Sequence, residues 1–267
     1  MTDYVHGYSE REAQRLRDQA GSVRHLLHWD TAYPPGSLVL EAGCGVGAQT
    51  VTLARNGGRA SFVSIDLAHS SILQARAAAD AEGLRNVTFC RADLLNAPFA
   101  PGTFDHVFIC FLLEHLAYPV SALRAARELL KPGGSVTAIE GDHGSCYFHP
   151  ETREAMRAWD CLIEVQRRMG GDSLIGRKLY PLLAAAGFRG VEVSPRMVYA
   201  DVSRPEVMES FVERTIVPMV EGVRAQALEL GLMTPAGWER GLEDLKAIAR
   251  SPEGSFCYTF FKAVGVR

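Results

Sequence analysis

The most informative segment of this chain reads Val39-Leu40-Glu41-Ala42-Gly43-Cys44-Gly45-Val46-Gly47-Ala48. An apolar run from Ser37 to Leu40 predicts a buried strand, and residues 49–55 after the glycines predict a helix. Strand, glycine turn and helix in this order are typical of a nucleotide-type site at the edge of a parallel sheet. Because glycine lacks a Cβ and adopts positive φ, the backbone can turn sharply here and lie against a flat ligand, beside the free amides of the following helix.

This glycine pattern is compatible with more than one ligand. Gly43-x-Gly45-x-x-Ala48 also satisfies the dinucleotide-binding fingerprint, with alanine as the third small residue. A tight turn that binds nothing is a further alternative. The rest of the chain therefore has to distinguish between these ligands.

Composition sets the broad class of the protein. The chain has 267 residues, of which 47% are hydrophobic and 22% charged, as in an ordinary globular protein. Its net charge of −3 gives no basic surplus for binding nucleic acid.

No apolar run approaches the roughly 18 residues of a membrane span, and the polar start Met1-Thr2-Asp3-Tyr4 lacks a signal-type apolar core. The six cysteines are scattered without a Cys-x-x-Cys pair, which favours a reducing, cytoplasmic location over a disulfide scaffold or a zinc site.

Strands and helices alternate through the first half of the chain. Ser9 is placed to cap a helix that runs to about Trp29, and Ser70 to cap a helix over residues 71–82. The predicted strands of this region are 37–40, 60–65, 87–90, 106–110 and 135–139, and a further helix covers 120–130. This alternation predicts an α/β fold with a parallel sheet and helices on both faces, whose strand ends place any ligand at one edge.

The alternation breaks after Glu140. Helices are predicted over residues 150–169 and 175–186, a strand over 191–198, and helices again over 205–250, with Pro218 kinking the first and Thr234-Pro235 starting the second. The chain ends in a β-prone run, Phe256 to Val264, which fits an antiparallel strand at the end of the sheet. We expect one domain over residues 1–267, with a lid helix in 1–34, a ligand-binding core in 35–140, and a helical cap insertion in 203–252 over the ligand edge.

Four acidic residues stand at predicted strand ends: Glu41, Asp66, Asp93 and Glu140. Asp66 lies where a carboxylate can accept both hydroxyls of a ribose, since a carboxylate only accepts hydrogen bonds. Helix capping is the alternative role for Asp66 and Asp93.

Five features follow one another along residues 35–140. They are Glu41-x-Gly43-x-Gly45-x-Gly47, Asp66, Ala92-Asp93, Phe104-Asp105, and Leu130-Lys131-Pro132-Gly133-Gly134. Together they resemble the class I S-adenosylmethionine-dependent methyltransferases, and most closely the ubiquinone-biosynthesis-like group that acts on small molecules. The resemblance implies a Rossmann-like sheet of seven strands, mostly parallel, with an antiparallel C-terminal strand. It also implies S-adenosylmethionine as cofactor and S-adenosylhomocysteine as product.

The resemblance implies roles for residues around the turn. Gly43, Cys44 and Gly45 pack against the methionine half of the cofactor, Asp66 holds the ribose hydroxyls, and Leu67 lies beside the adenine. Asp93 meets the adenine amino group near the Leu94 amide. Glu41 orients the turn or reaches the cofactor amine through water. The remaining cofactor candidates are Cys110, Phe111 and His115 after the fourth strand, and Tyr8 and Gln19 from the lid helix.

The acceptor side is expected in the polar segment Asp142–His149 after the fifth strand. His143 is the candidate base, with Tyr147 or His149 orienting the acceptor, because a neutral O or N acceptor needs a group that takes its proton. His115, which follows Glu114, is an alternative base. Ordinary loop polarity is the competing interpretation for the whole segment, and no third ligand accompanies His143 and His149 for a metal.

The leading hypothesis is methyl transfer to a small, partly apolar acceptor, which accords with methionines in the cap although these also suit an ordinary core. A tRNA or protein methyltransferase, an NAD(P)-dependent oxidoreductase and a non-catalytic cofactor-binding protein remain alternatives. The sequence leaves the acceptor, the methylated atom and the oligomeric state open.

Overall fold

A computed structural model describes residues 10–267 and, within helix α1 (Glu10–His28), leaves the side chains of residues 10–14, 17 and 19 undescribed. The chain divides into two compact units. The sheet unit comprises Leu27–Gly141, Ile175–Arg196 and Phe260–Arg267, and the helical unit comprises the described part of Met1–Leu26 with Asp142–Leu174 and Met197–Thr259. The expected cap of residues 203–252 falls in the helical unit; its placement over the ligand edge stays a prediction.

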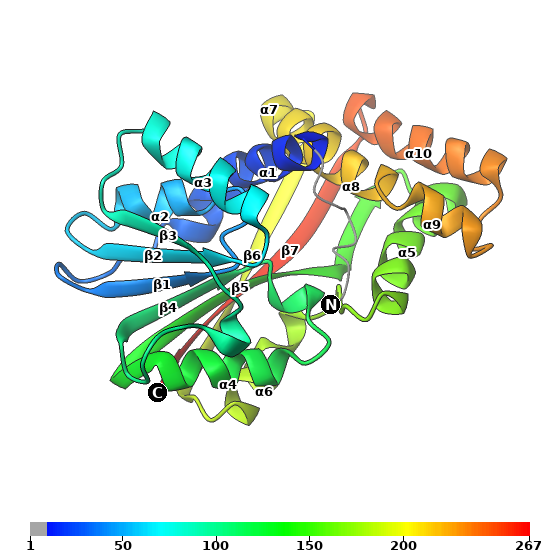
Figure 1. Ribbon diagram of the computed structural model, residues 1–267. Coiled ribbons are helices and arrows are strands. Elements are labelled where there is room, and N and C mark those ends of the chain that lie inside the picture. The colour runs from blue at the N-terminus through cyan, green and yellow to red at the C-terminus, as the bar shows by residue number, and fades with distance from the viewer. Residues whose placement is uncertain (1–9) are drawn as a thin grey trace. The chain divides into compact units, whose positions relative to one another are not determined.

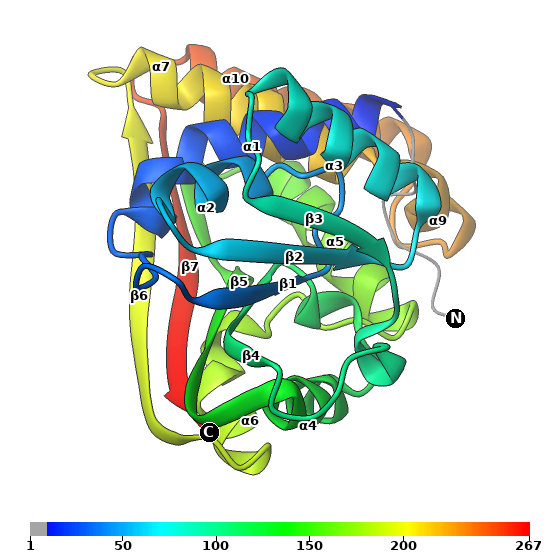
Figure 2. The same ribbon diagram turned by 60° about the vertical axis from the view of Figure 1, so that its left-hand side comes forward.

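A seven-stranded sheet has the strand order β3-β2-β1-β4-β5-β7-β6 (Figure 1). Its strands are β1 (Leu38–Ala42), β2 (Ser61–Asp66), β3 (Val87–Arg91), β4 (Phe104–Cys110), β5 (Leu130–His149), β6 (Arg189–Asp201) and β7 (Ser255–Val266). The pairs from β3 to β5 are parallel, whereas β6 and β7 run antiparallel to each other (Figure 2). The predicted seven-stranded, mostly parallel sheet with an antiparallel C-terminal strand is therefore confirmed.

Helices cover both faces of the sheet in the sheet unit (Figures 1 and 2). Helices α2 (Thr50–Asn56) and α3 (His69–Ala81) lie on one face, and α4 (Pro119–Leu129) and α6 (Leu179–Ala185) on the other. Leu40, Val107 and Ile109 of the central strands are buried together with Leu123 of α4 and Leu183 of α6. A strand that is buried on both faces has a continuous apolar sequence. This pattern is the one from which these central strands were predicted.

Three short 3₁₀ helices complete the sheet unit: η1 (Leu94–Asn96), η2 (Leu113–His115) and η3 (Gly176–Lys178). Register pairs Ala42 of β1 with Ile65 of β2, and Cys110 of β4 with Ile139 of β5. The carboxyl ends of β1, β2 and β4 consequently lie along one edge, as expected for parallel neighbours.

The helical unit contains α5 (Arg153–Arg168), α7 (Pro205–Val207), the π-helix η4 (Met208–Ile216), α8 (Val217–Glu221), α9 (Arg224–Glu229) and α10 (Pro235–Arg250), as well as most of α1. Helices α5 and α10 approach closely at Gly241, where a Cβ would collide with the carbonyl of Glu154. Helix α10 starts at Thr234-Pro235 as predicted, and Thr234 caps it by accepting a hydrogen bond from Gly237 N–H at 3.2 Å. Pro218 is the second residue of α8, just after the change from η4 to α8, and the predicted kink stays a prediction. None of the described helices has the length and apolar character needed to cross a membrane.

Two local predictions are wrong. The fifth strand does not end near Glu140, because β5 continues to His149 and turns the expected loop 142–149 into strand. The extended backbone continues through Gly144 and ends at His149, directly before Pro150. Ser70 does not cap α3 either. The helix starts two residues earlier than predicted, at His69, with Ala68 as the N-cap residue, whose N–H donates to Asp66 Oδ1 at 2.9 Å. The predicted cap at Ser9 lies outside the described residues.

Candidate functional site

The glycine turn adopts the backbone that its sequence predicts. Gly43, Gly45 and Gly47 have φ values of 75°, 51° and 81°. Gly43 N–H and Cys44 N–H both donate to the carbonyl of Ile65, at 2.8 and 2.9 Å, so the turn is fastened to the end of β2. A Cβ on Gly47 would lie 2.8 Å from Ala75 Cα of α3. Gly47 is therefore required for close packing of the turn against a helix.

Gly45 differs from its two neighbours because the space where its Cβ would stand is open. No atom lies within 4 Å of that position, whereas a Cβ on Gly43 would meet the Leu112 side chain at 3.0 Å. Gly45 thus presents bare backbone at the carboxyl edge of the sheet. We call this open backbone surface at Gly45 the cradle, because a flat or extended ligand needs such a surface for close approach.

Asp66 stands beside that cradle at the end of β2. Its Oδ2 accepts from Gly45 N–H at 2.9 Å, and its Oδ1 accepts from Ala68 N–H at 2.9 Å. Burial raises the pKa of Asp66, although the amides of Ala68, Gly45 and Leu67 oppose the change. Each carboxylate oxygen has a second lone pair, so both can still accept from hydroxyl donors. Leu67 follows with 55% of its surface exposed, which leaves an apolar face at this edge.

Asp93 performs the capping role that was the alternative prediction for it. Its Oδ1 accepts from Leu95 N–H at 3.0 Å, so Asp93 caps η1. Leu94 is buried within that turn. The geometry places a carboxylate and a 3₁₀ turn after β3, and it does not by itself indicate a ligand.

Glu41 is buried at the end of β1 with two hydroxyl partners. Thr50 Oγ1 of α2 donates to its Oε2 at 2.7 Å, and Ser64 Oγ of β2 donates to the same atom at 2.6 Å. Burial raises the pKa of Glu41 to about 7 despite these two hydrogen bonds. Glu41 therefore ties β1, β2 and α2 together next to the turn, and its predicted role toward the turn or the cofactor stays a prediction.

The segment after β4 carries a strained residue. Phe111 has φ 53°, a left-handed value that is uncommon for a bulky side chain and often marks a functional site. Cys110 before it is buried, which raises the pKa of its thiol. His115 Nε2 lies 3.4 Å from Glu114 Oε1, and its side chain is 19% exposed. These three cofactor candidates thus lie along the segment whose Leu112 reaches Gly43.

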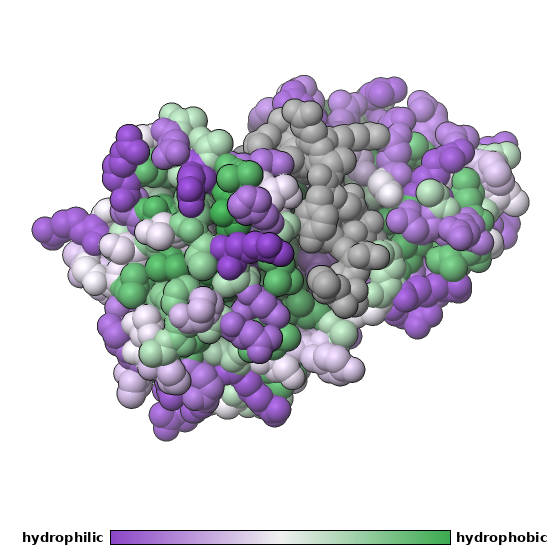
Figure 3. Space-filling view, viewed as in Figure 1, coloured by the Kyte–Doolittle hydropathy of each residue, from purple (hydrophilic) through white to green (hydrophobic). Residues whose placement is uncertain are grey.

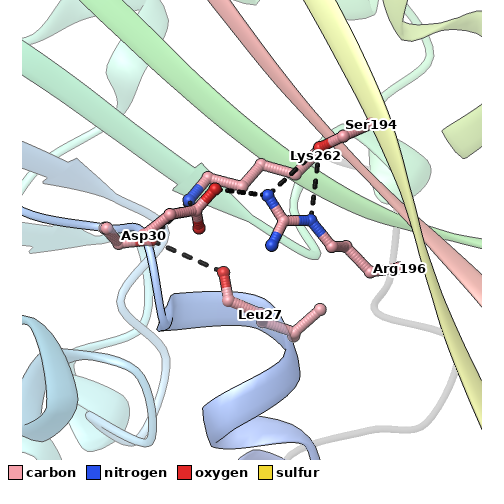
Figure 4. Close-up of polar contacts among 6 residues, drawn as sticks. Leu27, Asp30, Ser194, Arg196 and Lys262 are labelled. Carbon is pink, nitrogen blue, oxygen red and sulfur yellow. Dashed lines mark hydrogen bonds and ion pairs between the residues drawn. The ribbon is translucent and has the colours of Figure 1, made fainter.

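The carboxyl end of α1 is anchored in the sheet unit. His28 Nε2 is 2.7 Å from Gln49 Oε1, directly after the glycine turn, and burial lowers the pKa of His28 to about 4. Figure 4 shows the Asp30 carboxylate between Lys262 of β7 and Arg196 of β6. The distances are 2.7 Å to Lys262 Nζ and 2.5 Å to Arg196 Nη2. Sequence reasoning missed both contacts, since their partners are far apart in the chain.

The acceptor-side candidates fall in the helical unit. His143 is 5% exposed, and its Nδ1 is 2.7 Å from the Tyr258 hydroxyl. Trp159 Nε1–H donates to the His143 carbonyl at 2.9 Å. Tyr147, by contrast, is 56% exposed and directs its hydroxyl to Met197 Sδ at 3.9 Å. The structure thus brings His143 to Tyr258.

Two lid-helix candidates cannot be placed. Tyr8 lies outside the described residues, and the side chain of Gln19 is not described. On the face in view, hydrophilic side chains are spread over both units with apolar ones between them (Figure 3).

Comparisons with known proteins bear on the same region. Residues 39–134 match the family model described as "Methyltransferase domain". The chain is 36% identical to a ubiquinone biosynthesis O-methyltransferase of Nitrosococcus oceani, over 48% of this chain and 57% of that protein. It is 32% identical to a 2-phytyl-1,4-naphtoquinone methyltransferase of Thermosynechococcus vestitus, over 54% of this chain and 64% of that protein. The chain thus spans somewhat over half the length of these curated relatives.

Solved structures of methyltransferases share the fold. A phosphoethanolamine N-methyltransferase 2 of Haemonchus contortus, in complex with S-adenosylhomocysteine, aligns with a TM-score of 0.56 and 17% identity, covering 94% of this chain and 53% of that one. A S-adenosylmethionine-dependent methyltransferase of Aquifex aeolicus aligns with a TM-score of 0.50 and 16% identity, covering 73% of this chain and 94% of that one.

Proposed function

The chain belongs to the S-adenosylmethionine-dependent methyltransferases through the domain of residues 39–134, and we propose that it transfers a methyl group to a small, partly apolar acceptor. The observation that carries the proposal is the open space above Gly45, flanked by an Asp66 carboxylate bonded to the Gly45 amide. The names of the quinone-related relatives support the class of acceptor.

The residues at the carboxyl edge suit this cofactor. The bare backbone at Gly45 would lie against the methionine half, Asp66 would accept from the two ribose hydroxyls, and the exposed Leu67 would cover the adenine. Asp93 and Leu94 would complete the adenine side. When bound, the cofactor supplies a methyl group activated by its sulfonium, so the protein has to supply position and electrostatics.

Most of the rate would then come from holding the acceptor in line with the methyl group. We assign removal of the acceptor proton to His143, with Tyr147 as an acceptor-side contact. The role requires that Nδ1–H donates to the Tyr258 hydroxyl, which leaves Nε2 unprotonated and able to take an O–H or N–H proton.

Calorimetric titration tests the cofactor assignment. We expect S-adenosylmethionine and S-adenosylhomocysteine to bind in the micromolar range and NAD(P) not to bind. Asp66→Ala should weaken S-adenosylhomocysteine binding by more than ~1 kcal/mol, because the ribose hydroxyls lose their acceptor. Binding of NAD(P) alone, by a protein shown to be folded, would overturn the proposal.

Mass spectrometry tests the reaction. Apolar hydroxylated and amino acceptors, hydroquinones among them, are incubated with the cofactor and screened for the gain of one methyl group. With a productive acceptor, His143→Ala should lower kcat by about 10²- to 10⁴-fold and leave S-adenosylhomocysteine affinity nearly unchanged. Full activity of that variant would remove His143 from the mechanism.

A further inference from the structure

Glu140 is a fully buried carboxyl group with an unusual set of partners. Its side chain, in the middle of β5, is 0% exposed. Its Oε1 accepts from Leu112 N–H at 3.0 Å and from Leu113 N–H at 2.8 Å. Within the described part of the chain, its Oε2 has no hydrogen-bond partner. A buried polar atom without a partner costs free energy, so its retention requires an explanation.

The surroundings of Glu140 disfavour its charged form. Burial raises its pKa well above the usual range, and the nearby Glu114 carboxylate adds to the effect, while the amides of Leu113, Leu112 and Glu114 oppose it. A neutral carboxylic acid still offers a carbonyl oxygen that accepts from two amides. The two amide bonds therefore do not require a charge on Glu140.

The bonds of Glu140 fix the segment that reaches the glycine turn. Leu112 directly follows Phe111, whose φ of 53° is strained. The Leu112 side chain lies so close to the turn that a Cβ on Gly43 would be 3.0 Å from its Cδ1. A strained backbone persists only where surrounding interactions hold it in place. The hydrogen bonds that the amides of Leu112 and Leu113 donate to Glu140 of β5 are interactions of this kind.

We propose that Glu140 is a positioning residue of the cofactor site, which holds the amides of Leu112 and Leu113 so that Leu112 packs against Gly43. The inference rests on the proposed function, since it concerns the same cradle. Glu140 touches neither cofactor nor acceptor in this assignment. It acts through Leu112 on the shape of the turn.

The chain offers a matched control in Asp105. Its Oδ2 accepts from Leu38 N–H at 2.8 Å, which is the same kind of bond in the same sheet. Asp105 lies near the start of β4, at the opposite end of the strand from Cys110. Loss of Glu140 removes two carboxyl–amide bonds, and loss of Asp105 removes one together with its 2.7 Å bond to Lys131 Nζ. Only Glu140 faces the segment that contacts the turn.

The test measures S-adenosylhomocysteine affinity by calorimetry and amide hydrogen exchange at residues 111–115 for four variants. Glu140→Ala and Glu140→Asp should each raise Kd by about 5- to 100-fold and accelerate exchange at Leu112 and Leu113, because the amides lose their acceptor. Glu140→Gln, whose amide oxygen can accept both bonds, should stay within about threefold of the wild type. Asp105→Ala should lower the midpoint of thermal unfolding and leave Kd within about threefold.

Two results would overturn the assignment: unchanged Kd in Glu140→Asp, or an equal loss of affinity in Asp105→Ala. Glu140→Asp keeps a buried acid and carries the test if Glu140→Ala does not fold. If the wild type fails to bind S-adenosylhomocysteine, the proposed function fails. The exchange measurement then still decides whether Glu140 holds the two amides.

Discussion

Gly45 and Gly58 have similar backbone conformations, so a comparison of their alanine variants distinguishes the effect of backbone strain from the effect of ligand contact. Their φ values are 51° and 54°, and no atom lies within 4 Å of the Cβ position of either residue. Gly45 belongs to the turn at the carboxyl edge of the sheet, whereas Gly58 precedes β2 at the other edge.

Alanine at either position should cost about 1–2 kcal/mol of stability, because an L side chain is disfavoured at this φ. Only Gly45→Ala fills the cradle, so only this variant should weaken S-adenosylhomocysteine binding, by at least about tenfold. Urea unfolding and calorimetry on both variants check the prediction. Equal affinities of the two variants would show that the ligand does not approach Gly45.

Glu41 should make the protein less stable as the pH rises. Its folded pKa of about 7 exceeds the value near 4.3 of an unfolded glutamate, so the native state binds more protons between these values. Stability is then highest below about pH 4 for this group, and roughly 3 kcal/mol is lost by the time the pH passes 7.

Glu41→Gln keeps an oxygen for the Thr50 and Ser64 hydroxyls and removes the titration. The free energy of unfolding of the wild type, minus that of Glu41→Gln, should therefore fall between pH 5 and pH 8. Urea unfolding at both pH values provides the measurement. Parallel pH dependence of the two proteins would show that Glu41 does not titrate in this range.

At the scale of elements, the Asp30 ion cluster fixes the end of α1 to β6 and β7. Asp30 bonds two cations whose side chains are only 8% and 4% exposed, Arg196 and Lys262. Glu164 also bonds two cations at 2.7 Å, but these, Arg167 and Arg168, are 67% and 42% exposed. The two carboxylates have equal exposure, 30%, so the burial of the cations is what differs.

Asp30→Ala should lower stability by about 3–5 kcal/mol, because it leaves two buried cations without their carboxylate. Glu164→Ala should change stability little, since exposed ion pairs are screened by water. Burial acts to raise the pKa of Asp30, but the bonds to Arg196 and Lys262 outweigh it and hold the pKa below the ordinary value. This contribution is therefore present above about pH 4 and is lost as the pH falls further.

Thermal and urea unfolding of both variants at pH 7 test this prediction. A loss in Glu164→Ala as large as that in Asp30→Ala would contradict it.

The elements up to β4 could be predicted because each carries a local signal. Apolar runs of four to six residues, glycine and proline breaks, and acids at strand ends are all readable without the fold. The segment 142–149 could not be assigned in this way. Its polar residues suggested a loop, but pairing within a sheet is a long-range property, and it allows such residues to continue a strand as far as His149.

In the candidate site, too, features with a local sequence signal could be predicted and long-range contacts could not. The positions of Glu41, Asp66 and Asp93 followed from strand ends, whereas Glu140 lies within β5, and the partners of all four were not predicted. Glu140 received no role because its partners, the amides of Leu112 and Leu113, are 28 and 27 residues away in sequence. Tyr258, which is 115 residues from His143, was missed for the same reason.

At the scale of the whole molecule, the two units share three strands. β5, β6 and β7 each begin in one unit and end in the other. The backbone of each of these strands therefore runs without a break from one unit into the other. Strand continuity of this kind favours a single cooperative unfolding transition, in which neither unit loses its strands alone.

The tryptophans allow this cooperativity to be measured. Trp159 and Trp238 lie buried in the helical unit, at 2% and 0% exposure, whereas the 64% exposed Trp29 lies in the sheet unit. In a Trp29→Phe protein, fluorescence therefore reports on the helical unit, while the residues assigned to the cofactor's adenosine and methionine moieties belong to the sheet unit. S-adenosylhomocysteine at 100 times its Kd should raise the unfolding free energy seen by fluorescence by ~2.7 kcal/mol, because a cooperative transition transmits the full binding energy. If the fluorescence midpoint stays fixed while far-ultraviolet circular dichroism shifts, the two units unfold independently, and the shared strands do not couple them.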